Sequence, residues 1–378
     1  MTGAGLDPLL ARGGRLARTR DAMREAGVDV LLLSLGADMP WLIGYEAMPL
    51  ERITMLVLPA DDDATLVVPA LEAPRVAHDA RLFSLRPWSE SEDPIAVIAD
   101  LVGSRVEMGI SDRTWATSLL ALQHALPGRR FRPASAVTSA LRSVKDPGEI
   151  AALRAAGAAA DRVADALLGG EIQMIGRREA DVSEEIGRRL IAEGHNKVNF
   201  AIVGSGPNSA SPHHEPGERV IGVGEPVVCD FGGTLRLGDT VGYCSDTTRT
   251  VVTGEPDPLF AELYAVLESA QEVAVEGAMI GTTCEAVDAL GRDLISRAGF
   301  GDGFIHRIGH GIGIEEHETP YLVAGNTTPL QPGHAFSVEP GIYLAGRFGA
   351  RIEDIVVATE GGPLRCNVSD RGLHVVEA

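Results

Sequence analysis

Five residues in the second half of the chain are of the types that hold divalent cations, and each lies in or beside an apolar segment flanked by glycine. They are Asp230, Asp246, His310, Glu339 and Glu353. Burying an unpaired carboxylate is costly, and each residue alone is equally well explained by a salt bridge, a turn or an exposed charge. Together, four carboxylates and one imidazole suit two hard divalent cations, because bridging carboxylates can hold both metals and offset their charge. The set predicts an oxygen-rich metal centre.

The four cysteines indicate no thiolate-rich zinc or redox site. They are widely scattered and form no Cys-x-x-Cys pair: Cys229, Cys244, Cys284 and Cys366. This spacing fits a reducing compartment. The first residues contain no basic segment that leads into an apolar stretch and a cleavage site. No run of about 18 apolar residues is present that could span a bilayer. We therefore expect a cytoplasmic protein.

Composition narrows the classes of partner. The chain has 378 residues, 45% of them hydrophobic, which is enough for two domains or one large one. Its 33 basic and 53 acidic side chains give a net charge of −20, which repels phosphate backbones and anionic membrane surfaces. We expect neither nucleic acid nor membrane as a partner.

The N-terminal part alternates short apolar runs with helical segments. We predict helices at 9–27 and 115–126 and strands at 28–33, 53–58 and 65–68. Such alternation is typical of a sheet covered by helices, and no cluster of candidate catalytic residues occurs in this part. A breaker at Asp146-Pro147-Gly148 follows a charged stretch. We therefore place an auxiliary domain at residues 1–143 and a second domain at 144–378.

The second part begins with an alanine-rich helical region and contains the candidate metal ligands. Predicted elements are a helix at 149–168 and strands at 198–203, 226–230, 247–252, 335–339 and 352–358. Two further helices have start signals, one at Asp257-Pro258 and one at Thr282, with Glu285 in capping-box spacing.

Several ordered motifs resemble the proline-specific, creatinase-like branch of the methionine aminopeptidase superfamily. Residues 141–150 (LRSVKDPGEI) resemble its domain junction, and 205–210 (SGPNSA) its substrate-side loop. The motifs at 309–313 (GHGIG), 338–343 (VEPGIY) and 351–354 (RIED) follow in the expected order. The resemblance covers nearly the whole chain. It implies an α/β (α+β) fold, with a pita-bread catalytic domain preceded by a smaller creatinase-like N-terminal domain.

By this resemblance the five residues named above are the metal ligands, with Asp246 and Glu353 bridging two divalent ions. Manganese is the expected metal, with cobalt or zinc as alternatives. The sixteen residues from Asp230 to Asp246 exceed the usual spacing and include another candidate, Asp239. We assign Asp246 because its context at 245–250 (SDTTRT) matches, and we expect residues 235–240 to form an enlarged hairpin loop.

Three histidines besides His310 are candidates for a role in catalysis: His213, His306 and His317. His306 and His317 would share one face of a helix with His310, but the intervening glycines favour a strand or loop. Ordinary polar turn residues are the simplest explanation of such histidines. The resemblance implies substrate-positioning or transition-state roles for them, foremost for His213 and His317, whereas His214 is expected only to be exposed.

Three residues are expected to contact the substrate or support the ligands by the same resemblance. They are His306, Tyr343 and Arg351.

The resemblance implies a metal-dependent Xaa-Pro dipeptidase, acting on short peptides with proline at the second position. Two cations sharing a water would supply hydroxide near neutral pH. Glu339 would relay a proton to the leaving nitrogen, and His213 or His317 would stabilise the oxyanion. A homodimer is also implied.

Two alternatives stay open at this point. An Xaa-Pro aminopeptidase would act on longer peptides; a dipeptidase needs a cation for the proline carboxylate, and the position where some prolidases have arginine is Tyr321 here, although Arg351 could supply the charge. A metal-free creatinase-like hydrolase or a silent binding protein is disfavoured, because all five ligand residues are present. Methionine aminopeptidase is disfavoured by the size of the N-terminal domain.

Overall fold

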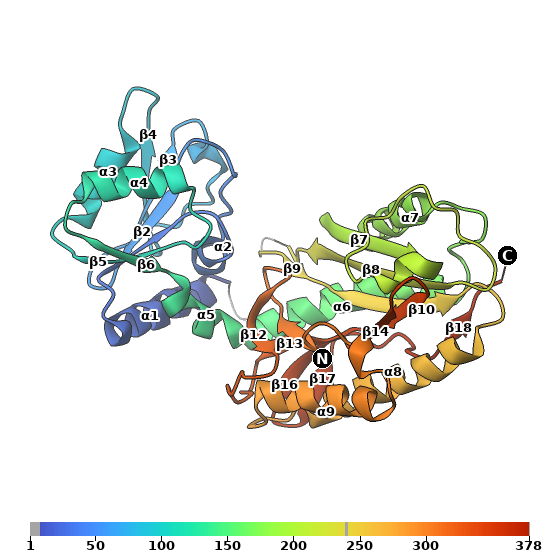
Figure 1. Ribbon diagram of the computed structural model, residues 1–378. Helices are drawn as coiled ribbons and strands as arrows, with labels where there is room; N and C mark the ends of the chain where they lie inside the picture. Colours follow the sequence, from blue (N-terminus) through green and yellow to red (C-terminus); the bar gives the residue numbers. More distant parts are fainter. Residues whose placement is uncertain (1–7, 239–240, 378) are drawn as a thin grey trace, which may run out of the picture. The chain divides into compact units, whose positions relative to one another are not determined.

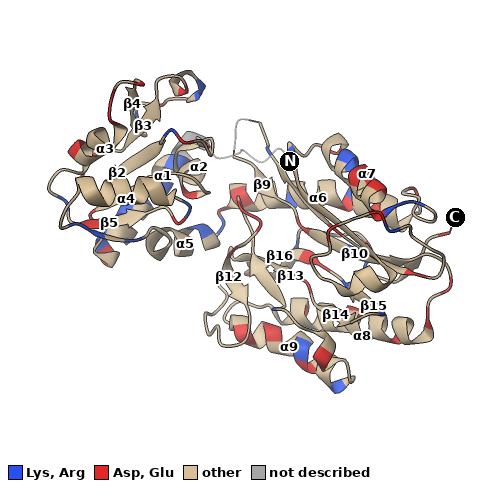
Figure 2. Ribbon diagram, turned by 45° about the horizontal axis from the view of Figure 1, so that its top comes forward, with Lys and Arg blue, Asp and Glu red and all other residues tan. Residues whose placement is uncertain are grey.

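The computed structural model describes residues 8–238 and 241–377. The chain divides into two compact units, one reaching to Arg142 and one formed by Ser143–Gly238 and Gly242–Ala378 (Figure 1). Within the described residues, no helix is long and apolar enough to cross a membrane. Figure 2 shows acidic and basic residues interspersed along the helices, for example in α7 and α9.

The N-terminal unit is built on a six-stranded mixed sheet in the order β4-β3-β2-β1-β5-β6. Its strands are β1 (Val30–Leu33), β2 (Met55–Pro59), β3 (Thr65–Pro69), β4 (Ser84–Trp88), β5 (Glu107–Ile110) and β6 (Arg130–Pro133). Its helices are α1 (Pro8–Ala26), α2 (Asp38–Ile43), η1 (Ala73–Arg75), α3 (Pro94–Val102) and α4 (Ala116–Ala125), and α5 (Ser135–Ser143) ends at the boundary. Apolar side chains of the central strands pack against α3 and α4. The predicted helix-covered sheet is confirmed.

The second unit contains two five-stranded sheets and a two-stranded ribbon. The first sheet runs β18-β10-β8-β7, with β9 also paired to β8, and the second runs β12-β11-β13-β16-β17. The first comprises β7 (Lys197–Ser205), β8 (Pro226–Leu235), β9 (Tyr243–Cys244), β10 (Thr247–Val252) and β18 (His374–Val375). The second comprises β11 (Gly309–Gly311), β12 (Glu318–Leu322), β13 (Ala335–Val338), β16 (Asp354–Thr359) and β17 (Gly362–Arg365), while β14 (Gly341–Leu344) and β15 (Phe348–Arg351) form the ribbon.

Two pairs of helices cover these sheets. Side chains of α6 (Pro147–Leu168) and α7 (Glu179–Ala192) form one core with β7, β8 and β10. Side chains of α8 (Pro258–Gly277) and α9 (Cys284–Arg297) form another with the second sheet. Short 3-10 turns lie at η2 (Gly206–Ala210) and η3 (Gly301–Gly303). This arrangement is the expected α/β architecture of the second unit.

The helix starts follow local capping chemistry. Asp146 and Glu149 form a reciprocal capping box at α6, with Pro147 in the first turn. Asp257 caps α8 as predicted, by accepting from the Leu259 N–H at 2.8 Å. The start predicted at Thr282 is wrong by one residue, because Thr283 is the N-cap and accepts from the Ala286 N–H. Adjacent threonines offer the same hydroxyl, so spacing alone does not separate them.

Candidate metal centre

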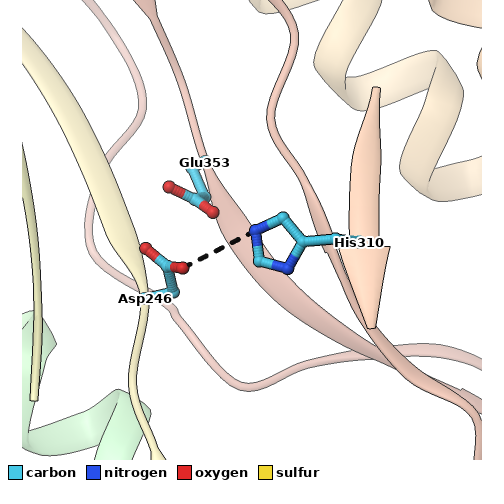
Figure 3. Close-up of side chains that lie close together, drawn as sticks. All are labelled: Asp246, His310 and Glu353. Carbon is cyan, nitrogen blue, oxygen red and sulfur yellow. Dashed lines mark ion pairs between the residues drawn. The ribbon is translucent and has the colours of Figure 1, made fainter. Parts of the chain in front are cut away.

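Three of the expected ligands converge from three separate elements. Asp246 follows β9, His310 is the middle residue of β11, and Glu353 lies between β15 and β16. Each offers a ligand atom, and these atoms all lie within 4.8 Å of one another (Figure 3). The His310 Nε2 lies 3.8 Å from the Asp246 Oδ2. All three residues are at most 4% exposed, so the cluster is buried.

The cluster lies where the two five-stranded sheets of the second unit meet. An isolated antiparallel bridge joins Thr248 of β10 to Glu353, whose N–H donates to the Thr248 carbonyl at 3.1 Å. The second sheet adds His310 through the pairing of β11 with β13. Neither sheet alone could hold the cluster.

Glu339 and Asp230 complete the predicted set. Glu339 directly follows β13, and its Oε1 lies 3.1 Å from the His310 Nε2. Asp230, on β8, is the cross-strand partner of Thr248. Its Oδ2 accepts from the Arg351 guanidinium at 2.6 Å. The five residues are therefore neighbours, although they span more than 120 positions of the chain.

The electrostatics of the cluster are those of a site built for cations. Burial, and then the charge of Asp230, raises the pKa of Asp246 well above its ordinary value. Burial and the charge of Asp246 do the same to the pKa of Glu353. Burial opposes ionisation of both His310 and Glu339, but their mutual hydrogen bond outweighs it, so the pKa of His310 rises to about 8 and that of Glu339 falls to about 2. Asp246 and Glu353 thus lack the compensating positive charge that His310 gives to Glu339.

Two observations indicate that divalent cations fit these residues. The Oδ1 of Asp230 is buried and has no hydrogen-bond partner, which is costly unless another group binds it. The donor set consists of carboxylate oxygens and one imidazole nitrogen, which suits hard or borderline dications. Thiols are not part of it: the two cysteines nearest to these residues in sequence, Cys229 and Cys244, are both buried, and burial raises the pKa of each thiol.

A series of hydrogen-bonded side chains leads away from Asp230 and holds its carboxylate in place. Arg351 donates to Asp230, and also to the Tyr343 hydroxyl at 2.8 Å. The Tyr343 hydroxyl lies 3.0 Å from the His306 Nε2, and the His306 Nδ1 lies 2.7 Å from the Arg307 carbonyl. The Nδ1 must donate to that carbonyl, so the Nε2 accepts from the tyrosine. Burial lowers the pKa of His306, consistent with this neutral tautomer.

Two hydroxyl groups orient ligands and were not found by sequence reasoning. The Thr248 Oγ1 donates to the Glu353 Oε2 at 2.8 Å and accepts from the Arg351 Nε at 3.1 Å. The Ser337 Oγ donates to the Glu339 Oε1 at 3.0 Å and accepts from the His310 N–H at 3.0 Å. In the sequence, each hydroxyl residue lies two positions from a predicted ligand, Thr248 from Asp246 and Ser337 from Glu339, and this spacing does not reveal its contacts.

The two histidines with predicted transition-state roles lie on loops. His317 is exposed, and its ring centroid lies 4.0 Å from that of His310. Desolvation, then the charges of His310 and Arg307 and, more weakly, of His213, lowers the pKa of His317 to about 4. His213 is also exposed and follows η2. The strand-or-loop prediction for this region is confirmed, since His310 is on β11.

The expectation that His214 is merely exposed is wrong. Its ring is half-buried, and its Nε2 lies 2.7 Å from the Oε2 of the fully buried Glu179. A partner 35 positions upstream gives no local signal, so the sequence did not reveal the contact. Of the predicted loop 235–240, Leu235 ends β8 and Asp239 lies outside the described residues.

Comparisons with known proteins agree with this geometry. Residues 151–360 match the model of metallopeptidase family M24, and residues 15–144 match the creatinase/prolidase N-terminal domain. The chain is 45% identical over 366 residues to a probable dipeptidase PepE of Mycobacterium tuberculosis, covering 96% of each chain. It is 34% identical to an Xaa-Pro dipeptidase of Lactobacillus helveticus, covering 96% of this chain and 98% of the relative.

A solved structure extends the agreement to the whole fold. A prolidase from Thermococcus sibiricus superposes with a TM-score of 0.90 at 34% identity, covering 99% of this chain and all of that one. Three findings together identify the family of this chain: the buried cluster of carboxylates and imidazole, the two matching domain models and the relatives that match nearly its full length. It belongs to metallopeptidase family M24, in the prolidase-like branch that has a creatinase/prolidase N-terminal domain.

Proposed function

We propose that this chain is a metal-dependent Xaa-Pro dipeptidase that hydrolyses the bond before proline in short peptides. The observation that carries the proposal is the buried cluster of Asp246, His310 and Glu353, with Glu339 and Asp230 beside it. The relatives named dipeptidase and Xaa-Pro dipeptidase, which match nearly the full chain, support the substrate class.

The five clustered residues would hold the cations, with Asp246 and Glu353 shared between two of them. When bound, the cations would supply Lewis-acid activation of water and of the scissile carbonyl. The unpartnered Oδ1 of Asp230 is available to them, while Arg351 fixes the other oxygen of that carboxylate. The raised pKa values of Asp246 and Glu353 support this assignment, because cations remove the repulsion that causes them.

Glu339 would move the proton during hydrolysis. Its side chain is the least buried of the four carboxylates, at 15% exposed, which favours its contact with a substrate. From there it would take a proton from the attacking water and deliver it to the leaving imino nitrogen. The Ser337 hydroxyl donates a hydrogen bond to the Glu339 Oε1 and so restrains the orientation of the carboxylate that would transfer the proton.

His317 and His213 would face the substrate from their loops. Both are exposed, and the stacking of His317 on His310 brings it next to the cluster. Either imidazole N–H would stabilise the developing oxyanion. For His306, Tyr343 and Arg351, the hydrogen bonds to one another and to Asp230 support an orienting role. Direct substrate contact by any of the three stays a prediction.

Manganese, a homodimer and a cytoplasmic location also stay predictions. The oxygen-rich donor set supports manganese over softer metals.

The test is metal removal from the purified protein followed by addition of manganese, cobalt or zinc, with Ala-Pro, Ala-Pro-Ala and Ala-Ala as substrates. We expect metal-dependent cleavage of Ala-Pro and little of Ala-Ala. Preference for Ala-Pro-Ala would instead identify an Xaa-Pro aminopeptidase. Absence of cleavage with every metal would refute the peptidase mechanism.

A further inference from the structure

A dipeptidase has one requirement that the metal cluster does not meet. The proline carboxylate of an Xaa-Pro substrate is two bonds from the imino nitrogen, at about 2.5 Å, so it must enter the site together with the scissile bond. A buried carboxylate without a counter-charge is costly. The cation that receives it must therefore lie beside the cluster and have no other acidic partner.

Most basic side chains of this region are already paired with carboxylates. Arg351, which is 2% exposed, binds Asp230 and also donates to Tyr343 and Thr248. The other paired cations are Lys145 with Glu318 at 3.2 Å, Arg249 with Asp354 at 2.7 Å, and Arg292 with Asp288 at 2.7 Å. The earlier expectation that Arg351 supplies the carboxylate-binding charge is thus not supported by its contacts.

Arg307 differs from all of them. Among the described residues, its guanidinium has neither a hydrogen bond nor an ion pair, and its Cζ lies 4.4 Å from the ring centroid of Tyr321. Stacking on an aromatic face restrains a guanidinium and leaves its edge N–H groups available. The residue is only partly exposed, so this charge is not simply a solvated surface group.

Strand register places this pair next to the metal centre. Tyr321 of β12 is the antiparallel partner of His310 of β11, and the register shift comes only after that pair. Directly opposed residues point to the same face of a sheet, with Cβ atoms about 5 Å apart. The Tyr321 ring and the Arg307 above it therefore lie on the face where His310 enters the cluster. The charge of Arg307 also acts on His317, which stacks on His310.

We infer that Arg307, held on the Tyr321 ring, is the residue that binds the C-terminal carboxylate of the dipeptide and so restricts the enzyme to dipeptides. This inference rests on the proposed function and names the group that sets substrate length. A free carboxylate gains paired N–H donors and a counter-charge, whereas the neutral amide of a longer peptide at the same position does not. Tyr321, which stands where some prolidases have arginine, then provides the platform for a cation from the segment just before β11.

The experiment compares Ala-Pro with its neutral analogue Ala-Pro amide, using the manganese-loaded full-length protein. Arg307→Gln should lower kcat/KM for Ala-Pro by about 10- to 100-fold, the value of a hydrogen bond to a charged group. Cleavage of Ala-Pro amide, slow in the wild type, should change by no more than about threefold. Arg307→Lys should keep part of the preference for Ala-Pro, because it retains the charge but not the planar fork.

A matched control separates the carboxylate contact from a general loss of charge. Arg347 also stacks on an aromatic ring, 4.9 Å from the Phe348 centroid, but is about half exposed and pairs with Asp257 at 3.5 Å. Arg347→Gln should leave both substrates unaffected. The assignment would be overturned if Arg307→Gln lowered kcat/KM equally for Ala-Pro and its amide, or for neither. It would also be overturned if the wild type cleaved both substrates equally well. A wild type that cuts no Xaa-Pro substrate would refute the proposed function, and the assignment with it.

Discussion

A single hydroxyl group links two of the carboxylates proposed as metal ligands. Thr248 donates to Glu353 and accepts from Arg351, and Arg351 in turn holds Asp230. The hydroxyl therefore orients the Glu353 carboxylate directly and the Asp230 carboxylate through Arg351. Outer partners of this kind commonly change metal affinity or activity by 10- to 100-fold when removed.

Thr248→Val tests this link, because valine keeps the shape and the strand preference but removes both hydrogen bonds. We expect manganese affinity to fall by about 10- to 100-fold, with a destabilisation of about 1–3 kcal/mol from the unmet donor and acceptor. Isothermal titration calorimetry, in which manganese is added to the metal-stripped protein, measures the affinity.

Thr253→Val is the matched control. Thr253 is fully buried, directly follows β10, and bonds to Gly222 and Glu225 away from the cluster. It should lose comparable stability while keeping its metal affinity. Equal affinity losses in the two variants would show that Thr248 has no special role.

At the scale of elements, a buried glutamate at the start of α7 holds the loop that contains His213. Glu179 is fully buried and accepts from the Ser205 N–H and hydroxyl, both at 2.7 Å, and from the Asn208 amide at 3.1 Å. His214 completes the set at 2.7 Å. These contacts fasten both ends of the segment from the end of β7 to His214, so that His213 projects from an anchored loop.

The pH dependence of stability should reveal this anchor. Burial raises the pKa of Glu179, but hydrogen bonds from Ser205, His214 and Asn208 outweigh it, and the net shift is downward. A lowered folded-state pKa means that the carboxylate stabilises the protein above its unfolded pKa and stops doing so as the pH falls through the folded value. Glu179→Gln should therefore cost about 1–3 kcal/mol at pH 7 and less at pH 4.

Urea-induced unfolding of the second, catalytic unit (residues 143–238 and 242–378), at pH 7 and at pH 4, measures how much free energy of unfolding the variant loses at each pH. Glu184→Gln, on an exposed position of the same helix, should change stability by less than about 0.5 kcal/mol at either pH. A gap between wild type and Glu179→Gln that is equal at pH 7 and pH 4 would contradict the role of the ionised carboxylate.

The sequence predicted the elements and the ligand motifs because both leave local signals. Asp230, His310 and Glu339 lie in glycine-flanked apolar runs, and Asp257-Pro258 marks a helix start. Contacts between distant segments leave no such signal. Glu179 appears in sequence as an ordinary acid in the first turn of a helix, and its partners are 26 to 35 positions away.

The pair of Arg307 and Tyr321, proposed to bind the substrate carboxylate, is a second contact that the sequence alone could not predict. That Arg307 stacks on Tyr321 depends on the register of β11 against β12 and on the position of the irregularity within it. A shift of one residue would place Tyr321 on the opposite face. Register is fixed by the packed sheet and not by the local residue types.

At the scale of the whole molecule, the chain folds around separate cores. Apolar side chains of the N-terminal unit form one cluster, and the catalytic unit has its own clusters around α6 to α9. All five proposed ligand residues belong to the second, catalytic unit. Two of them, Asp246 and Glu353, have strongly raised pKa values, so their ionised forms oppose folding near neutral pH until a cation offsets them.

Scanning calorimetry of the metal-stripped protein should therefore resolve two transitions, of which manganese raises only one. A ligand that binds the native state alone at about 100 times its Kd adds about 2.7 kcal/mol, or about 5–10 °C for a domain of this size. Asp246→Asn should show a higher catalytic-unit transition without metal, because it removes a repelled charge, and little or no rise with manganese. If the protein instead showed a single transition that manganese raises as a whole, the two units would unfold as one, and the ligand cluster would stabilise the whole chain instead of its own core.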